Sequence, residues 1–289
     1  MAAGSIAVGA LVLALKLAAW KITGSAALFS DAAETVVNVL AACVALGALS
    51  FAARPADANH PYGHDKAEFF SAVIEGVLIV LASVLIVEQA WMSWRNPVPL
   101  EQGLLGLGLN AVSSVLNVGW ASLLLRRGKS LRSPALVADG RHLMSDVVTS
   151  VGVLVGVGLV LATGLQWLDP AVAVVAALYV LVSGISVIKG SVSGLMDEAP
   201  AEDVMDRIRA IVAEQAQGAI EAHDLRTRQA GRQTFLEFHL VVPGAMTVKD
   251  AHAICDRIEA ALKAEMEGLM ITIHVEPEGK AKHHGVLVL

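Results

Sequence analysis

The fold of this 289-residue chain is decided by residues 25–49, which read SAALFSDAAETVVNVLAACVALGAL. Most of these residues are Ala, Val and Leu, and the stretch exceeds the ~20 apolar residues that a helix needs to cross a bilayer. Asp31, Glu34 and Asn38 nevertheless lie inside it. An ionised acid at mid-membrane costs on the order of 3 kcal/mol even on lenient insertion scales. The stretch therefore predicts a membrane helix whose polar face has a function.

The composition of the whole chain supports a membrane protein. Hydrophobic residues make up 55% and charged residues 17%, and the mean hydropathy is +0.63, outside the usual range of soluble proteins. The net charge is −6 and the basic residues are scattered, so we expect no nucleic-acid partner. Cys43 and Cys255 lie far apart, which indicates neither a disulfide framework nor a thiolate metal site.

The apolar character changes near residue 200, where long apolar runs give way to charged sequence. This change predicts a transmembrane domain over 1–195, a cytoplasmic domain over 200–278 and a flexible tail over 279–289. No Lys or Arg precedes the first apolar run, so we interpret that run as a retained helix and not as a signal peptide.

Six segments are long enough to cross a bilayer, and an even number of crossings places both ends of the chain on one side. We predict spans over about 3–23, 26–53, 68–94, 103–125, 134–163 and 168–192. The basic residues that fall on the side of the termini are Arg54, Lys66, Arg126, Arg127, Lys129, Arg132 and Lys189. Lys21 and Arg95 fall on the other side, so the positive-inside bias predicts that both termini are cytoplasmic.

Two of the predicted spans carry matching polar sets. Asp31, Glu34 and Asn38 have i, i+3, i+7 spacing and share one helical face, and the fifth span contains DGRHLMSDVVTS at 139–150. This second set consists of Asp139, His142 and Asp146, of which His142 and Asp146 are one turn apart. Two readings remain open, because such groups either lock helices together by a polar contact or form a cation site.

A cation site would be built from Glu34, Asn38, His142 and Asp146. Two carboxylates, an imidazole and an amide oxygen suit a divalent first-row metal with four ligands. Histidine titrates near neutral pH and metal-free carboxylates can take up protons, so the same atoms could exchange protons for metal. Asp31, one turn away, is either an entry ligand or a helix-contact residue.

Two further charged residues, Lys16 and Glu75, lie inside predicted spans, and for both we favour a structural role. Lys16 can either reach the interface with its charged end or pair with an acid.

A second candidate metal cluster lies in the loop ADANHPYGHDKAEFF at 56–70. His60 and His64 are four residues apart, and Asp57 precedes His60 by three. Two histidines and an acid at short spacing are a moderately specific metal pattern, although a solvated loop that happens to contain histidine remains an alternative. Pro61 and Gly63 indicate a shaped loop and not a regular helix.

The sequence after residue 200 predicts a small α+β unit with the order αββαβ. Its helices are expected at about 201–217 and 247–266, and its strands at 219–229, 232–242 and 270–276. The unit contains four histidines and a nearby acid, which are His223, His239, His252, His274 and Glu276. They are read either as half-buried surface side chains or as a metal site.

These residues together resemble the cation diffusion facilitator family, and specifically its bacterial zinc/iron efflux branch. The resemblance covers nearly the whole chain and rests on GSAALFSDAAETVVNV, RPADANHPYGHDKAE, VADGRHLMSDVVTS, AHDLRTRQAG, FLEFHLVV and ITIHVEPE. It implies a homodimeric antiporter in the bacterial inner membrane that exports a divalent metal, with Zn²⁺ the leading candidate, in exchange for protons by alternating access. It also implies a ferredoxin-like, metallochaperone-type cytoplasmic domain that binds metal and strengthens the dimer.

The resemblance also assigns residues to three sites. The transport site falls on Glu34, Asn38, His142 and Asp146, the loop site on Asp57, His60 and His64, and the tail site on His223, His239, His252, His274 and Glu276. Lys66 and Asp197 match a pair that links the two protomers at the membrane surface. The chain departs from the branch at Glu34 and Asn38, where Asp or His and then Asp are usual. An amide at Asn38 removes one negative charge and one proton acceptor, which bears on the preferred metal and the proton count.

Three other classes of function fit the sequence less well than a transporter. A membrane-anchored metal-sensing or metal-binding protein without transport is the main alternative, but an anchor has no use for buried acids. We do not expect an enzyme, because no nucleophile–base pair or Gly-rich phosphate loop lies beside the metal residues. A passive channel is disfavoured because a chelating site binds too tightly for fast conduction.

Overall fold

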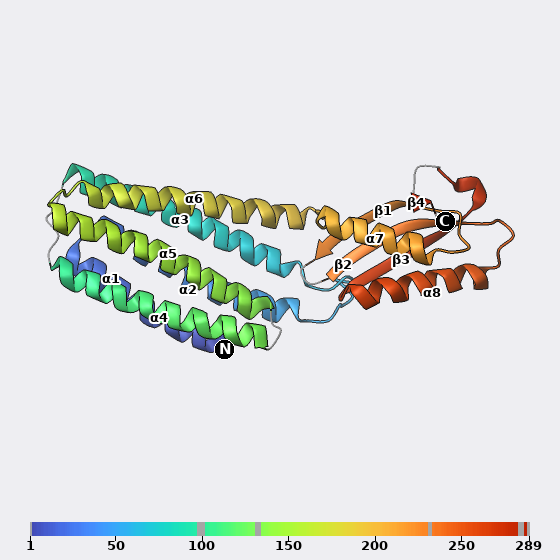
Figure 1. Cartoon of the computed structure of the whole chain (residues 1–289), viewed down its shortest axis with the longest axis horizontal. Helices are drawn as coiled ribbons and strands as arrows, with labels where there is room; N and C mark the ends of the chain where they lie inside the picture. The colour runs from blue at the N-terminus through green and yellow to red at the C-terminus, as the bar shows by residue number, and fades with distance from the viewer. Residues whose placement is uncertain (1, 97–101, 131–133, 231–232, 283–285, 288–289) are drawn as a thin grey trace. The chain divides into compact units, whose positions relative to one another are not determined.

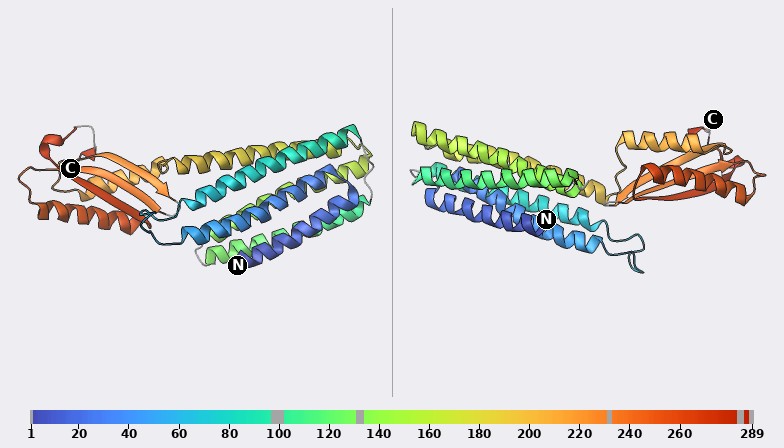
Figure 2. Two further views of the ribbon diagram at one scale, coloured as in Figure 1. Left: turned by 180° about the vertical axis from the view of Figure 1, so that it is seen from behind. Right: turned by 60° about the horizontal axis from the view of Figure 1, so that its bottom comes forward.

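The computed structural model describes residues 2–96, 102–130, 134–230, 233–282 and 286–287, and Figures 1 and 2 show its helices and strands from three sides. The chain divides into two compact units. The first unit comprises residues 1–48 and 71–189, and the second comprises residues 49–70 and 190–289.

In the described part of the chain, six helices are long and apolar enough to cross a membrane, as the sequence predicts. They are α1 (Ala2–Thr23), α2 (Ala26–Ala52), α3 (Ala67–Arg95), α4 (Gly103–Ser130), α5 (Pro134–Thr163) and α6 (Leu168–Leu195). Glycines end two of them: Gly24 (φ 68°) follows α1 and Gly164 (φ 73°) follows α5, and each donates its backbone N–H to the residue four before it. A left-handed residue after the last helical turn favours glycine, which explains why the chain turns at TGS and TGL.

The helices of the first unit pack through small residues. Helix α4 lies against α1 and α5, while α3 and α6 run side by side. At the α3–α6 crossing, a Cβ on Gly76 would lie 3.0 Å from the carbonyl oxygen of Gly184, and a Cβ on Gly184 would lie 3.1 Å from that of Gly76. The two backbones therefore approach as closely as glycine alone permits.

An acid of α6 caps the start of α2. The Oδ1 atom of Asp169 accepts a hydrogen bond from Ser25 Oγ at 2.5 Å, and its Oδ2 accepts one from the backbone N–H of Ala26 at 2.6 Å. The backbone N–H of Ala27 also donates to Oδ1, at 3.3 Å. These contacts satisfy N–H groups that have no partner within the helix, and they fix the start of α2 against α6.

The second unit contains the predicted αββαβ order. Its elements are α7 (Glu202–Gln215), β1 (Glu221–Ala230), β2 (Gln233–Val242), α8 (Val248–Glu265) and β3 (Leu269–Pro277), then a 3₁₀ turn (Glu278–Lys280) and the short strand β4 (Val286–Leu287). The sheet order is β3-β2-β1-β4, in which only the β2–β3 pair is parallel. Strand β4 pairs with Glu221 and Ala222 of β1 and lies in the segment for which the sequence predicts a flexible tail.

The core of this α+β domain follows the two periodicities expected of its elements. Ile208 and Ile211 of α7 and Ile258 and Leu262 of α8 lie three or four residues apart and are buried, and they pack with the buried alternate residues of β2, which include Phe238. Helical spacing of three to four and strand spacing of two bring all of these side chains into the same layer.

Candidate functional site

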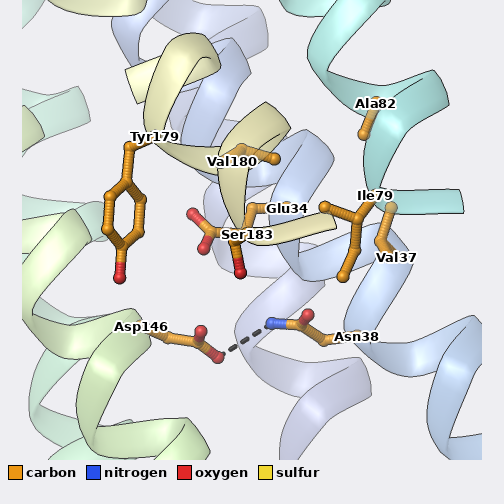
Figure 3. A pocket seen from close by; sticks show the side chains of 9 residues that line it. All are labelled: Glu34, Val37, Asn38, Ile79, Ala82, Asp146, Tyr179, Val180 and Ser183. Carbon is orange, nitrogen blue, oxygen red and sulfur yellow. Dashed lines mark hydrogen bonds between the residues drawn. The ribbon is translucent and has the colours of Figure 1, made fainter. Parts of the chain in front are cut away.

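The polar faces of α2 and α5 meet at a small cavity inside the first unit. The cavity has a volume of about 60 Å³ and is lined by residues of α2, α3, α5 and α6, which are Glu34, Val37, Asn38, Ile79, Ala82, Asp146, Tyr179, Val180 and Ser183. Figure 3 shows Asp146 of α5 facing Asn38 of α2, with Glu34 and Ser183 at the same opening. The structure thus places three of the four residues of the predicted transport site around one cavity.

Hydrogen bonds hold these side chains toward one another. The amide of Asn38 donates from Nδ2 to Oδ2 of Asp146 at 2.8 Å, and Thr149 Oγ1 donates to Oε2 of Glu34 at 3.3 Å. Only 5% of Asp146 is exposed. Because the amide nitrogen of Asn38 faces Asp146, its carbonyl oxygen is the atom that remains to bind a cation.

The fourth predicted residue, His142, belongs to α5 and lies one helical turn before Asp146. Its side chain falls outside the part of the structure that is described, as does that of Asp139. The backbone of α5 nevertheless gives His142 and Asp146 the i, i+4 relation from which the sequence predicts a shared face.

One turn away from the cavity, Asp31 forms a buried ion pair that the sequence leaves open. Lys16 Nζ of α1 donates to Oδ1 of Asp31 at 2.7 Å and to Oγ of Ser150 at 2.9 Å. Ser150 Oγ in turn donates to the same Oδ1 at 2.7 Å. The side chains of Lys16 and Asp31 are 2% and 1% exposed, so Lys16 does not reach an interface but pairs with an acid.

The loop between α2 and α3 gathers its three predicted residues. His60 Nδ1 and His64 Nε2 lie 3.2 Å and 3.4 Å from the two carboxylate oxygens of Asp57, and the two imidazole rings are 4.5 Å apart. The carboxylate also accepts the backbone N–H groups of His60 and Asn59, at 2.7 Å and 2.9 Å. These bonds, led by that of His60, lower the pKa of Asp57 and keep it anionic. Asp57, His60 and His64 can together hold a metal ion.

Strand register brings the tail residues together. His223 of β1 is paired with His239 of β2, and His239 is paired with His274 of β3. Glu276 lies on the same face as His274, and its carboxylate is 3.3–3.7 Å from ring nitrogens of all three histidines. Adjacent rings are 5.3 Å and 5.0 Å apart. Four of the five residues predicted for the tail site therefore form one cluster.

The buried polar atoms of this cluster fit a bound metal. His223 is 3% exposed, and neither of its ring nitrogens has a hydrogen-bond partner in the described part of the chain. Carboxylate oxygens of Glu221 and Glu276 lie 3.3 Å and 3.4 Å from Nδ1 and Nε2 without forming a hydrogen bond, and coordination to a metal would satisfy these nitrogens. His239, His274 and Glu276 would supply the other ligand atoms.

His252 lies apart in the arrangement of the single chain. It is on α8, its side chain is 74% exposed, and its Nε2 lies 3.6 Å from Oδ1 of Asp256. Its assignment to the tail site stays a prediction.

Sequence reasoning missed Asp224, which lies with His223 and His239 in a group of possible ligands. Asp224 adopts a left-handed conformation (φ 53°) where the β1–β2 register shifts. Lys282 donates to its carboxylate at 2.5 Å, and this bond lowers the pKa of Asp224. The letters AHD at 222–224 were the available signal, but a strand alone would turn His223 and Asp224 to opposite faces.

Lys66 and Asp197 form an ion pair of 2.8 Å within one chain. Its role between protomers, which the family resemblance implies, stays a prediction.

Six helices of membrane-crossing length with an acid-lined cavity among them, followed by an α+β domain with a possible metal cluster, are features of a membrane transporter for cations. Family comparisons agree with this class. Residues 3–196 match the family described as "Cation efflux transmembrane domain", and residues 200–278 match "Cation efflux protein, cytoplasmic domain". The chain belongs to the cation efflux family, the cation diffusion facilitators, whose members are transporters.

Two curated relatives match nearly the whole chain, and a solved structure matches part of it. An uncharacterized transporter of Synechocystis sp. is 43% identical over 94% of this chain and 88% of its own length. The cation-efflux pump FieF of Shewanella oneidensis is 32% identical over 94% of this chain and 92% of its own. Among solved structures, CzrB in its Zn form is 52% identical over 30% of this chain and 98% of that chain, with a TM-score of 0.29.

Proposed function

We propose that this protein exports a divalent metal cation, with Zn²⁺ the leading candidate, from the cytoplasm in exchange for protons. It works by alternating access as a homodimer in the bacterial inner membrane, with both termini in the cytoplasm. Fe²⁺, Co²⁺, Ni²⁺, Cd²⁺ and Mn²⁺ are alternative substrates. The transport site consists of Glu34, Asn38, His142 and Asp146.

The observation that carries this proposal is the acid-lined cavity among the membrane helices. Glu34 and Asp146 line it together with Asn38, from two different helices. Acids inside a membrane are expensive and typically mark an ion pathway or proton relay. Two carboxylates also match the charge of a divalent ion.

Proton exchange follows from the same atoms. When no metal is present, two acids facing one small cavity repel each other, and protons relieve the repulsion. A divalent cation that enters the cavity needs the ionised ligands and therefore displaces the protons. Alternating exposure of the cavity to the two sides of the membrane then couples the outward movement of metal to the inward movement of protons.

The loop and tail clusters lie outside the spanning segments and suit a different role. Asp57, His60 and His64 form one cluster, and the three histidines around Glu276 form the other. Imidazole and carboxylate ligands suit Zn²⁺ and similar borderline metals. We assign both clusters to bound regulatory or structural ions, with the tail domain also strengthening the dimer.

Metal-driven proton flux in proteoliposomes tests the proposal. Asp146→Asn keeps the size of the side chain but removes the charge, and it should abolish the flux. Glu88→Gln is the matched control, because Glu88 is an exposed acid of α3 and is not among the residues that line the cavity. Undiminished flux in Asp146→Asn would refute the site. Metal binding without flux in the wild type would favour the alternative, a membrane-anchored metal-binding protein.

A further inference from the structure

Beside the cavity lies a charged group that the exchange reaction does not use. Lys16 of α1, Asp31 of α2 and Ser150 of α5 are joined by three hydrogen bonds of 2.7–2.9 Å, and all three side chains are buried. Asp31 precedes Glu34 by three residues, and Ser150 follows Asp146 by four. Residues at these spacings are neighbours on a helix surface, with Cβ atoms about 5–6 Å apart. These three residues, the Lys16 cluster, therefore lie one helical turn away from the residues that line the cavity.

If the Lys16 cluster only held three helices together, its contacts would be explained, but the use of charged residues would not. A buried ion pair is weak evidence for stability, because well-packed apolar residues of similar volume often replace it without loss. Its charges, however, affect every other charge nearby, since the effective dielectric constant inside a protein is low. Asp31 could itself exchange a proton or bind a cation if Lys16 were absent.

We propose that Lys16 is a resident counter-cation, which neutralises Asp31 and so restricts metal–proton exchange to Glu34 and Asp146. This inference rests on the proposed function and specifies its charge count. When ionised, Asp31, Glu34 and Asp146 carry three negative charges, and the positive charge of Lys16 neutralises one of them. The remaining net charge of −2 is equal and opposite to that of a divalent ion. Lys16 thus acts indirectly, through its ion pair with Asp31, and is not itself a ligand of the metal.

In the described part of the chain, the charged and polar groups near Asp31 come from α1, α2 and α5. Lys16 comes from α1 and Ser150 from α5, while Glu34 lies one turn away on α2 itself and Asp146 one turn beyond Ser150. Among these groups, Lys16 supplies the positive charge, and its Nζ contacts the carboxylate of Asp31 directly, at 2.7 Å.

The decisive measurement is the number of protons released per Zn²⁺ bound to the full-length protein, from calorimetry in buffers of different ionisation enthalpy. Lys16→Met leaves Asp31 as a buried acid without its cation, which should take a proton and release it when Zn²⁺ arrives. We expect about one proton more than in the wild type. Lys16→Arg keeps the positive charge and should restore the wild-type count.

A double variant separates charge from packing and also covers the case in which Lys16→Met does not fold. Lys16→Met with Asp31→Asn removes both charges and should release as many protons as the wild type. One proton fewer would mean that Asp31 already exchanges, which overturns the proposal, and so would an unchanged count in folded Lys16→Met. The loop and tail clusters are the same in every variant and cancel in the difference.

The same experiment distinguishes failure of the further inference from failure of the proposed function. If Asp146→Asn releases as many protons as the wild type, the membrane site itself is wrong. If Asp146→Asn releases fewer and only the Lys16 variants fail to differ, the site stands and the role of Lys16 is refuted.

Discussion

Replacing Asn38 by aspartate tests how the amide sets the charge of the cavity. In the wild type, Asn38 Nδ2 donates to Oδ2 of Asp146 at 2.8 Å. Asn38→Asp replaces this donor by a second carboxylate oxygen at nearly the same place. Two unit charges about 4 Å apart repel each other by about 4 kcal/mol at an effective dielectric constant of about 20. At about 1.36 kcal/mol per tenfold change, the doubly ionised pair becomes roughly a thousandfold less populated.

The metal-free cavity of Asn38→Asp should therefore hold about one proton more than that of the wild type. Binding of a divalent cation reverses the balance, because its charge favours both carboxylates in their ionised form. The ratio of protons moved to metal moved should rise by about one. The preference among metals should also change, since an amide oxygen is replaced by an anionic oxygen.

Proteoliposomes that contain both a pH indicator and a metal indicator report this ratio directly. The rates for Zn²⁺, Fe²⁺, Co²⁺, Ni²⁺, Cd²⁺ and Mn²⁺ are compared in the same preparation. Asn38→Ala is the matched control, because it removes the amide without adding a charge and should leave the ratio unchanged. An Asn38→Asp variant with the proton ratio and metal order of the wild type would refute the reasoning.

Three further predictions concern stability. Asp169→Asn should lower the free energy of unfolding by about 1–3 kcal/mol, since it weakens charged hydrogen bonds at the start of α2, and differential scanning fluorimetry checks this. Phe238→Ala should cost about 3–5 kcal/mol by the same assay because Phe238 is 1% exposed, whereas Val248→Ala, at a site 88% exposed, should cost little. Lys282→Met should lower the unfolding midpoint at pH 7, and the difference from the wild type should shrink as the pH falls below about 4. The bond from Lys282 lowers the pKa of Asp224 below its usual value, so its contribution is complete above about pH 4 and is lost as the pH falls through the lowered pKa.

The elements of the fold could be predicted wherever a periodic pattern is long. The membrane helices have 22 to 30 residues of apolar sequence, and α7, α8 and β2 show their periods clearly. Strand β4 could not be found in this way, because Val286–Leu287 is too short to have a period. The closeness of the α3–α6 crossing also escapes the pattern, since Gly76 and Gly184 are separated by the whole of α4 and α5.

The candidate sites show the same division between local and distant contacts. Asp57, His60 and His64 are close in sequence, so their spacing alone predicts the cluster that the structure forms. Contacts that join distant segments leave no local signal. Lys16 and Ser150 are 134 positions apart, and a sequence gives no reason to select one serine among many.

The two acids of α2 show why residue type alone does not define the transport site. Asp31 and Glu34 are both acids on the same helix, three residues apart, and each lies within reach of a side chain of α5. The two acids differ in what they contact besides α2 and α5. Asp31 lies against α1, where Lys16 neutralises it, whereas Glu34 lies at the cavity that α3 and α6 complete. In the mechanism that we propose, the position of one lysine thus separates an acid that holds helices together from an acid that exchanges protons for metal.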